Sequence, residues 1–168
     1  MSYENPYEAP QTADLRSEYG RGDSDLAGRG TRLAAAFVDG IIGAVCNLPF
    51  VYYSGLLDYV LNQEPIPLDL MVMTAVVGFV IFILVHGYFL HLNGQTLGKR
   101  MLGIRIANLD GSVPSFGRVI GLRYLPVAVI ANVPVLGNIV PLIDVLFIFR
   151  GDRRCIHDLI AETKVVIA

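Results

Sequence analysis

The sequence predicts an α-helical membrane protein with two full transmembrane helices, a proline-broken helical hairpin and a small cytoplasmic β-hairpin-like element. The 168-residue chain is 54% hydrophobic and only 17% charged, which is too apolar for an ordinary soluble domain. Two apolar runs, residues 31–55 and 70–92, are each long enough to cross a bilayer. A third run, residues 119–149, is interrupted by prolines. Together these runs give about four membrane segments.

The composition also argues against several functions. The net charge is −2 and no basic patch with interleaved aromatic residues is present, so nucleic acid is not an expected partner. Cys46 and Cys155 are expected on different sides of the membrane interface, which makes a disulfide or a metal pair between them improbable. His86 and His91 are five residues apart and do not share one helix face. The sequence therefore predicts no metal and no cofactor.

Residues 1–30 are expected to form a disordered cytoplasmic tail. Prolines, glycines and charges of both signs are mixed there, with almost no aliphatic run. The basic start and compact apolar core of a secretory signal are not present. A membrane domain is expected from residue 31 to residue 168.

The first span, Thr31–Phe50 with an extension to Gly55, contains one acidic residue in its interior, Asp39. Arg32 lies seven residues earlier, which returns it to nearly the same helix face. A carboxylate at that depth is disfavoured by roughly 2.5 kcal/mol or more, so Asp39 should face protein or water. Small residues on the same face would let another helix approach closely: Ala35, Ala36, Gly40 and Gly43.

The distribution of basic residues predicts the topology. The loop over residues 56–69 has no Lys or Arg and is expected outside, whereas residues 93–118 contain Lys99, Arg100, Arg105 and Arg118 and are expected in the cytoplasm. If residues 119–149 crossed once, the basic C-terminal tail would lie outside, against the same rule. An even number of crossings is therefore preferred, with the N- and C-termini both cytoplasmic.

The third apolar run, Val119–Phe149, is expected to be a short or re-entrant hairpin. Pro126, Pro134 and Pro141 interrupt it, with a turn-like segment near its centre. Two arms of about 14 residues would each reach only about 20 Å at helical rise, which is short for a full crossing.

Two β-branched runs on the cytoplasmic side are predicted to pair as a small sheet. Ile104–Ala107 alternates loosely and leads into a turn at Asp110-Gly111. Lys164–Ile167 is its natural partner, and the helix containing His157 is expected to cap the pair.

Charged residues inside the spans are the candidate functional residues. Arg123 lies in the rising arm of the hairpin and Asp144 in the descending arm, at depths similar to that of Asp39. We expect an intramembrane layer of these three residues, in which Arg123 pairs with Asp39 or Asp144. Arg32 is expected to extend toward the cytoplasmic rim of this layer, because helix side chains lean toward the N-terminus.

Three sequence blocks resemble the RDD family of small bacterial membrane proteins, named for one arginine and two aspartates. The blocks are Arg32 and Asp39 in the first span, residues 94–100 after the second, and the closing residues 157–161. The resemblance covers residues 30–168 and implies a multi-pass location in the bacterial inner membrane. It equates Asp158 with the second aspartate. It also implies a role in transport, since some members are proposed sodium/proton antiporters.

Two hypotheses for the function follow, and they differ in the role of the charged residues. In the first, the chain is an ion or small-solute transporter, coupled to a cation or proton that binds Asp39 or Asp144. About four segments seldom enclose a pathway alone, so a homo-oligomer is expected. In the second, the chain is a non-transporting accessory protein and the network of Arg32, Arg123 and the aspartates is structural.

An enzymatic function is not expected. The Gly94–Arg100 segment superficially resembles a phosphate-binding loop, but three residues rather than four separate its glycines, and arginine follows the lysine. Asp158 and His157 are adjacent in a helix and point apart, so they do not form a direct acid–base pair. Asp158 is expected instead to cap its helix or to pair with Arg153, Arg154 or Lys99.

Overall fold

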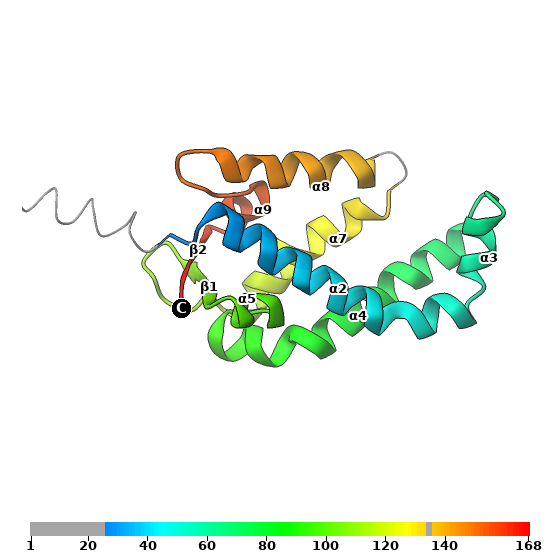
Figure 1. Ribbon diagram of the computed structural model, residues 1–168, viewed down its shortest axis with the longest axis horizontal. Coiled ribbons are helices and arrows are strands. Elements are labelled where there is room, and N and C mark those ends of the chain that lie inside the picture. The colour runs from blue at the N-terminus through cyan, green and yellow to red at the C-terminus, as the bar shows by residue number, and fades with distance from the viewer. Residues whose placement is uncertain (1–25, 134–135) are drawn as a thin grey trace, which may run out of the picture.

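The computed structural model describes residues 26–133 and 136–168, which form a mostly helical structure with a two-stranded sheet (Figure 1). The first part contains α2 (Arg29–Tyr53), α3 (Leu56–Leu61), α4 (Leu68–Asn93), α5 (Leu97–Met101) and β1 (Ile104–Asn108). The hairpin region contains α6 (Phe116–Arg118), the π-helix η1 (Val119–Tyr124), α7 (Leu125–Ala131), α8 (Leu136–Leu146) and the 3₁₀-helix η2 (Phe147–Phe149). The chain ends with α9 (Ile156–Ile160) and β2 (Thr163–Ile167).

The two predicted full spans correspond to α2 and α4, which are long and apolar enough to cross a membrane. Their bounds differ from the predicted ones by about two residues. At about 1.5 Å per residue, 25 and 26 residues give helices of roughly 40 Å. Apolar side chains such as Phe37, Val45, Val76 and Leu84 are exposed on their surfaces. This exposure is what lipid contact requires.

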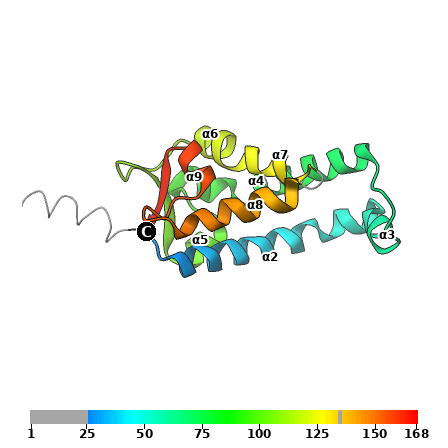
Figure 2. The same ribbon diagram turned by 90° about the horizontal axis from the view of Figure 1, so that it is seen from above.

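The ends of the molecule differ in structure. The short helix α3 joins α2 to α4 at one end, while the sheet, α5, α9 and the C-terminus lie together at the other (Figures 1 and 2). The α3 connection carries Asp58, Glu64 and Asp69, whereas the sheet end carries Lys99, Arg105 and other basic residues. This separation has the pattern that the charge rule predicts for the two sides of a membrane.

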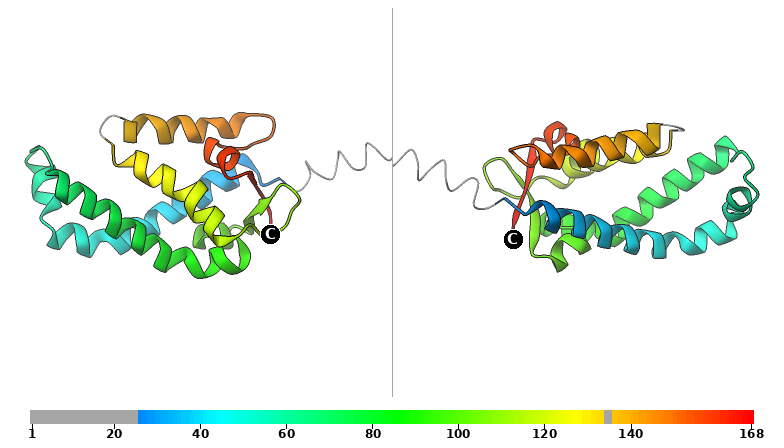
Figure 3. Two further views of the ribbon diagram at one scale, coloured as in Figure 1. Left: turned by 180° about the vertical axis from the view of Figure 1, so that it is seen from behind. Right: turned by 45° about the horizontal axis from the view of Figure 1, so that its top comes forward.

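Residues 116–149 form a helical hairpin, as the prolines predict. The rising arm is continuous from α6 through η1 to α7, and α7 packs against α8. The π-helix ends just before Pro126, whose ring would clash with the carbonyl four residues earlier in a regular α-helix. The hairpin is shorter than α2 and α4, whose α3 ends extend beyond it (Figure 3). The predicted turn includes residues 134–135, which lie outside the described residues.

The predicted sheet is confirmed, with β1 and β2 antiparallel and Ile104 opposite Ile167. It is not a hairpin, however, because residues 109–162 separate the two strands. The Asp110-Gly111 turn leads into α6, whereas α9 immediately precedes β2 and packs against it.

The described residues begin at Leu26, and residues 26–30, which were assigned to the N-terminal tail, contact the sheet and begin α2. Leu26 forms a bridge with Val166, and the backbone N–H of Ala27 donates to the carbonyl of Val165. Ala27 then packs with Ala35 and Ile104 in a buried cluster. The segment before α2 is thus tied to the sheet. Residues 1–25 lie outside the described residues.

Candidate functional site

Three buried charged residues form a group that we call the arginine–aspartate cluster: Arg32 from α2, Arg123 from η1 and Asp158 from α9. Each arginine donates to a different carboxylate oxygen of Asp158, which is 0% exposed. Arg32 also donates to the carbonyl of Arg153, and Arg123 to the hydroxyl of Thr163 at 2.7 Å. A single carboxylate thus ties the first helix and the hairpin to the C-terminal segment.

Local sequence places Asp158 in this position. Cys155 is the N-cap residue of α9, and its backbone N–H donates to Oδ2 of Asp158 at 3.1 Å, an arrangement typical of a capping box. Arg154 closes the next turn by donating to the Asp158 and Thr163 carbonyls at 3.2 and 3.0 Å. Hydrogen bonds within the C-terminal segment therefore hold this carboxylate in addition to the two arginines of the distant segments.

In this cluster two guanidinium groups face one carboxylate, so the negative charge is compensated and one positive charge remains. Burial alone would raise the pKa of Asp158, but the positive charges of Arg123 and Arg32 hold that pKa well below its usual range. The carboxylate is therefore ionised at neutral pH. Removing one partner of such a buried group costs about 3–5 kcal/mol, because an uncompensated charge remains. The cluster consequently stabilises one arrangement of three segments.

The predicted intramembrane layer is wrong in its pairings. Arg123 binds Asp158 rather than Asp39 or Asp144, and Arg32 is buried against the same aspartate rather than extended to a solvent rim. The physical reason is that α9 folds back beside η1 and brings a stronger, fully buried partner. The predicted capping role of Asp158 is confirmed, but its predicted salt bridges to basic residues of the nearby tail and of α5 are not the ones formed.

Asp39 is the centre of a second group, the Asp39 cluster, which consists of Asp39, Thr96, Gly98 and Lys99. The Thr96 hydroxyl donates to Oδ2 of Asp39 at 2.5 Å, and the backbone N–H of Gly98 donates to Oδ1 at 2.7 Å. Lys99 Nζ lies 3.7 Å from Oδ2. On another side, His86 Nδ1 lies 3.9 Å from Oδ1 and accepts the Leu97 N–H at 3.2 Å.

The glycines of residues 94–100 have a structural role, in place of the phosphate-binding role that was rejected. Gly94 has φ of +65°, where it ends α4, and a Cβ there would lie 2.5 Å from the Ile106 carbonyl oxygen. At Gly98, an added Cβ would overlap the Ala35 carbonyl oxygen and approach Asp39 Oδ1 to 2.9 Å. Close packing of α5 on α2 thus requires glycine, and this packing lets the carboxylate reach the Gly98 N–H.

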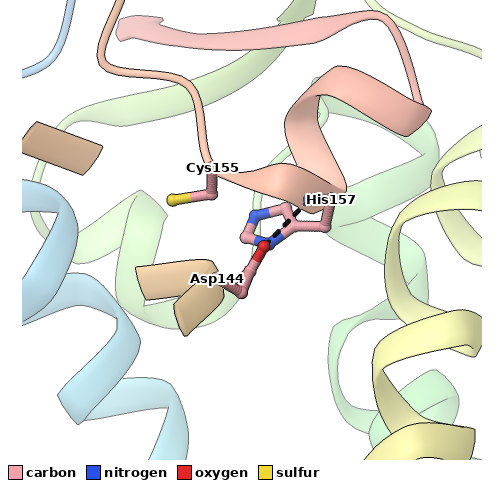
Figure 4. A group of neighbouring side chains, drawn as sticks. All are labelled: Asp144, Cys155 and His157. Carbon is pink, nitrogen blue, oxygen red and sulfur yellow. Dashed lines mark hydrogen bonds and ion pairs between the residues drawn. The ribbon is translucent and has the colours of Figure 1, made fainter. Parts of the chain in front are cut away.

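A third group joins the hairpin to the tail: Asp144 from α8 with Cys155 and His157 from the start of α9 (Figure 4). Asp144 accepts the backbone N–H of His157 at 2.9 Å and lies 2.5 Å from its Nδ1. Burial and the charge of Arg123 lower the pKa of His157, so this ring is neutral at pH 7. Burial raises the pKa of the Cys155 thiol to about 11.

Cavities connect the first two groups. A cavity of about 210 Å³ is lined by Arg32, Asp39, Lys99 and Arg123, with α4 and the hairpin closing its other sides. A second cavity, of about 270 Å³, lies between α2 and α4 and is lined by Asp39, Asn47 and His86. Asp39 lines both cavities, and its side chain is 15% exposed.

Sequence reasoning singled out every charged residue of these clusters except Lys99, but missed most of their neutral partners. Thr96 and Gly98 lie in the glycine-containing segment of residues 94–100. Their hydrogen bonds to Asp39 form because α5 packs back against α2. Cys155 was expected to take no part in a disulfide or a metal pair with Cys46, and His157 to form no acid–base pair with Asp158. The sequence signal for this third group was that Cys155 and His157 are two residues apart at the start of a helix.

Comparison with known proteins identifies a family and two relatives. The model of the RDD family matches residues 26–162, which includes all three groups. An uncharacterized protein YxaI of Bacillus subtilis is 30% identical over 153 residues, covering 83% of this chain and 96% of that protein. An uncharacterized protein of Haemophilus influenzae is 34% identical over 94 residues, covering 54% and 56% of the two chains.

No solved structure shows significant similarity to this chain. The family match extends over most of the sequence, and the matched residues include Arg32, Asp39 and Asp158. The chain therefore belongs to the RDD family.

Proposed function

We propose that this RDD-family chain is a multi-pass protein of the bacterial inner membrane that moves a proton or small cation, with Asp39 as the ion-binding carboxylate. The observation that carries the proposal is that Asp39 lines two cavities at once, of about 210 and 270 Å³. A carboxylate between two cavities can receive an ion from one and release it to the other. In this proposal the chain has no enzymatic chemistry.

The two long helices support the membrane location. Both α2 and α4 have the length and composition of spans and present apolar side chains outward. Basic residues gather at the end that holds the sheet and α5, which favours a cytoplasmic position for that end and for both termini. The proposed orientation places the 210 Å³ cavity on the cytoplasmic side of Asp39.

Lys99 supplies a means of exchange. Its Nζ is 3.7 Å from Asp39 Oδ2, close enough for electrostatic attraction but beyond the usual hydrogen-bond distance. A proton or cation that binds Asp39 takes over the charge compensation and releases Lys99 into the cavity that both residues line. The ammonium group can return when the ion leaves, so the site never holds an uncompensated carboxylate.

A second copy of the chain would complete the pathway. Gly40 and Gly43 of α2 line the 270 Å³ cavity and leave space around their backbones. Small residues let helices of two subunits approach closely in a bilayer. We therefore include a homo-oligomer in the proposal, with the far cavity completed at the subunit contact.

A second candidate function, a non-transporting accessory protein, is favoured by one observation. Asp39 accepts hydrogen bonds from Thr96 and from the Gly98 backbone, and these bonds fix α5 on α2. In that case the carboxylate is structural, and its loss weakens folding rather than flux.

Ion flux into proteoliposomes distinguishes the two functions. Purified protein is reconstituted with an internal pH-sensitive dye, and proton movement is recorded under gradients of Na⁺, K⁺ and Li⁺. Asp39→Asn keeps the shape and can still accept hydrogen bonds but removes the charge, so flux should be lost while size-exclusion behaviour is retained. Asp58→Asn, on exposed α3, is the matched control and should keep full flux.

Two results would overturn the transport proposal. Full flux in Asp39→Asn would show that the carboxylate carries no ion. A folded wild-type protein without flux under all three cations would favour the accessory function.

A further inference from the structure

The group formed by Asp144, Cys155 and His157 has the composition of a metal centre. One carboxylate oxygen, the thiol sulfur and one imidazole nitrogen all lie within 4.8 Å of one another. The sulfur and the imidazole ring lie on the same side of the start of α9, with the Asp144 carboxylate beside the ring (Figure 4). With bonds of about 2.0–2.3 Å, ligand atoms around tetrahedral zinc are roughly 3.3–3.8 Å apart, so closure by about 1 Å is sufficient.

We propose that these three side chains bind a zinc-class divalent cation. Sulfur, imidazole nitrogen and carboxylate oxygen form a mixed ligand set that suits Zn²⁺ better than Mg²⁺ or Ca²⁺, which prefer oxygen ligands. Binding replaces the thiol proton of Cys155 by the metal, and that proton leaves to solvent. No electron is transferred in this step.

His157 is oriented in the way that metal-ligating histidines require. Its Nδ1 lies 2.5 Å from Asp144 Oδ2, and its Nε2 lies 3.8 Å from Asp158 Oδ1. Nδ1 is within hydrogen-bond distance of a carboxylate oxygen, whereas Nε2 has a carboxylate nearby at a longer distance. Such carboxylate–histidine pairs fix the ring and increase its basicity as a ligand.

The surrounding charges accommodate the metal. The Cys155 thiolate and the Asp144 carboxylate together neutralise a divalent cation, so the metal and these two ligands carry no net charge beside the guanidinium groups of Arg32 and Arg123. Arg32 lies 3.7 Å from Cys155 Sγ, and its N–H donates to that sulfur, an interaction that strengthens when the sulfur is a thiolate.

The centre would lock the hairpin to the tail. Asp144 is on α8, while the other two ligands are at the start of α9, so one metal would strengthen a connection that the Asp144–His157 hydrogen bonds already make. Three protein ligands leave a fourth position, and Cys155 and His157 both line the 210 Å³ cavity that could supply water to it. None of the three ligands is in the Asp39 cluster, so this inference does not depend on ion transport.

Cobalt binding tests the site directly, because a thiolate ligand gives Co²⁺ a near-ultraviolet charge-transfer absorption. Metal-free full-length protein in detergent is titrated with Co²⁺, and Zn²⁺ is then added as a competitor. We expect one Co²⁺ per chain with a thiolate band, and displacement of the band by Zn²⁺. Asp144→Asn should weaken the apparent affinity about 10- to 100-fold.

The two cysteines give a matched pair of variants. Cys155→Ser is nearly isosteric and should abolish the thiolate band, whereas Cys46→Ser, on the exposed surface of α2, should keep it. In parallel, Zn²⁺ should raise the melting temperature of wild type and Cys46→Ser but not of Cys155→Ser. Absence of the band in folded wild-type protein, or its loss in Cys46→Ser alone, would overturn the proposal.

Discussion

The arginine–aspartate cluster and the Asp39 cluster each tie α2 to a later segment, but they bind their carboxylates differently. Asp158 is 0% exposed and accepts from two guanidinium groups. Asp39 is partly exposed to two cavities, accepts from two neutral groups, and has its cation 3.7 Å away. One carboxylate is held by direct contacts with two cations, and the other by neutral donors with a cation at longer range.

Two residues on the same face of α2 therefore have different structural roles. Arg32 and Asp39 are seven residues apart in α2, yet Arg32 binds the C-terminal tail and Asp39 binds the loop after α4. A fully paired buried group resists both solvent and ions, because any rearrangement exposes an unpaired charge to a low-dielectric interior. Asp39 instead has two neutral hydrogen-bond donors, and its nearest lysine ammonium group lies 3.7 Å away.

The largest expected effect is from neutralising the carboxylate held by two cations. Asp158→Asn leaves Arg32 and Arg123 buried without a negative partner, which should cost about 3–5 kcal/mol. We expect low expression and a strongly lowered melting temperature in detergent, measured on protein purified by size exclusion. Asp152→Asn, at a more exposed aspartate of the same tail, is the control and should change stability by less than about 0.5 kcal/mol. Equal melting temperatures for the two variants would mean that the cluster does not determine stability.

The second-largest effect is expected at Gly98, where α5 packs against α2 beside Asp39. Gly98→Ala places a methyl group against the Ala35 carbonyl oxygen and within 2.9 Å of Asp39 Oδ1, so α5 must move away from α2. Overpacking of this kind costs about 1–3 kcal/mol, which the melting temperature reports. Gly117→Ala meets no atom within 4 Å and should leave the melting temperature within the error of wild type. A tolerated Gly98→Ala would show that the loop, rather than α2, positions the Gly98 N–H.

A smaller effect is expected at Thr96, whose hydroxyl donates to Asp39 and accepts the Lys99 backbone N–H at 3.4 Å as the N-cap of α5. Thr96→Val removes both interactions at nearly constant volume and should cost about 1–2 kcal/mol. Thr96→Ser keeps the hydroxyl and should recover most of that loss. If valine and serine gave the same melting temperature, the hydroxyl would have no part in holding the carboxylate.

Much of the fold is predictable from the sequence because its signals are local. Apolar length predicts α2 and α4, prolines predict the broken hairpin, and β-branched runs predict the sheet. The pairings of the charges are not local. Arg123 and Asp158 are brought together by α9 folding beside η1, and depth along a helix cannot reveal that contact. The backbone N–H of Gly98 has no sequence signal as a ligand beyond the glycine itself.

The smallest effect is expected at Asp110, a carboxylate that is exposed to solvent, whereas Asp158 is buried. Asp110, in the turn after β1, accepts the Ser112 hydroxyl at 2.7 Å and its backbone N–H at 2.9 Å, and these bonds lower the pKa of Asp110. Because the folded pKa is below the unfolded value of about 3.9, the turn is stabilised above that pH, and the stabilisation is lost as pH falls through the folded pKa.

Ser112→Ala removes the hydroxyl bond but keeps the backbone one, so the pKa of Asp110 should rise part of the way toward its ordinary value. The carboxyl carbon-13 shift of Asp110, followed from about pH 2 to pH 6, measures this pKa directly. Ser115→Ala, at another exposed serine near the same turn, should leave it unchanged. An unshifted pKa in Ser112→Ala would mean that the backbone N–H alone holds the carboxylate. Because the group is solvated, the melting temperature at neutral pH should not respond to Ser112→Ala as it does to Asp158→Asn.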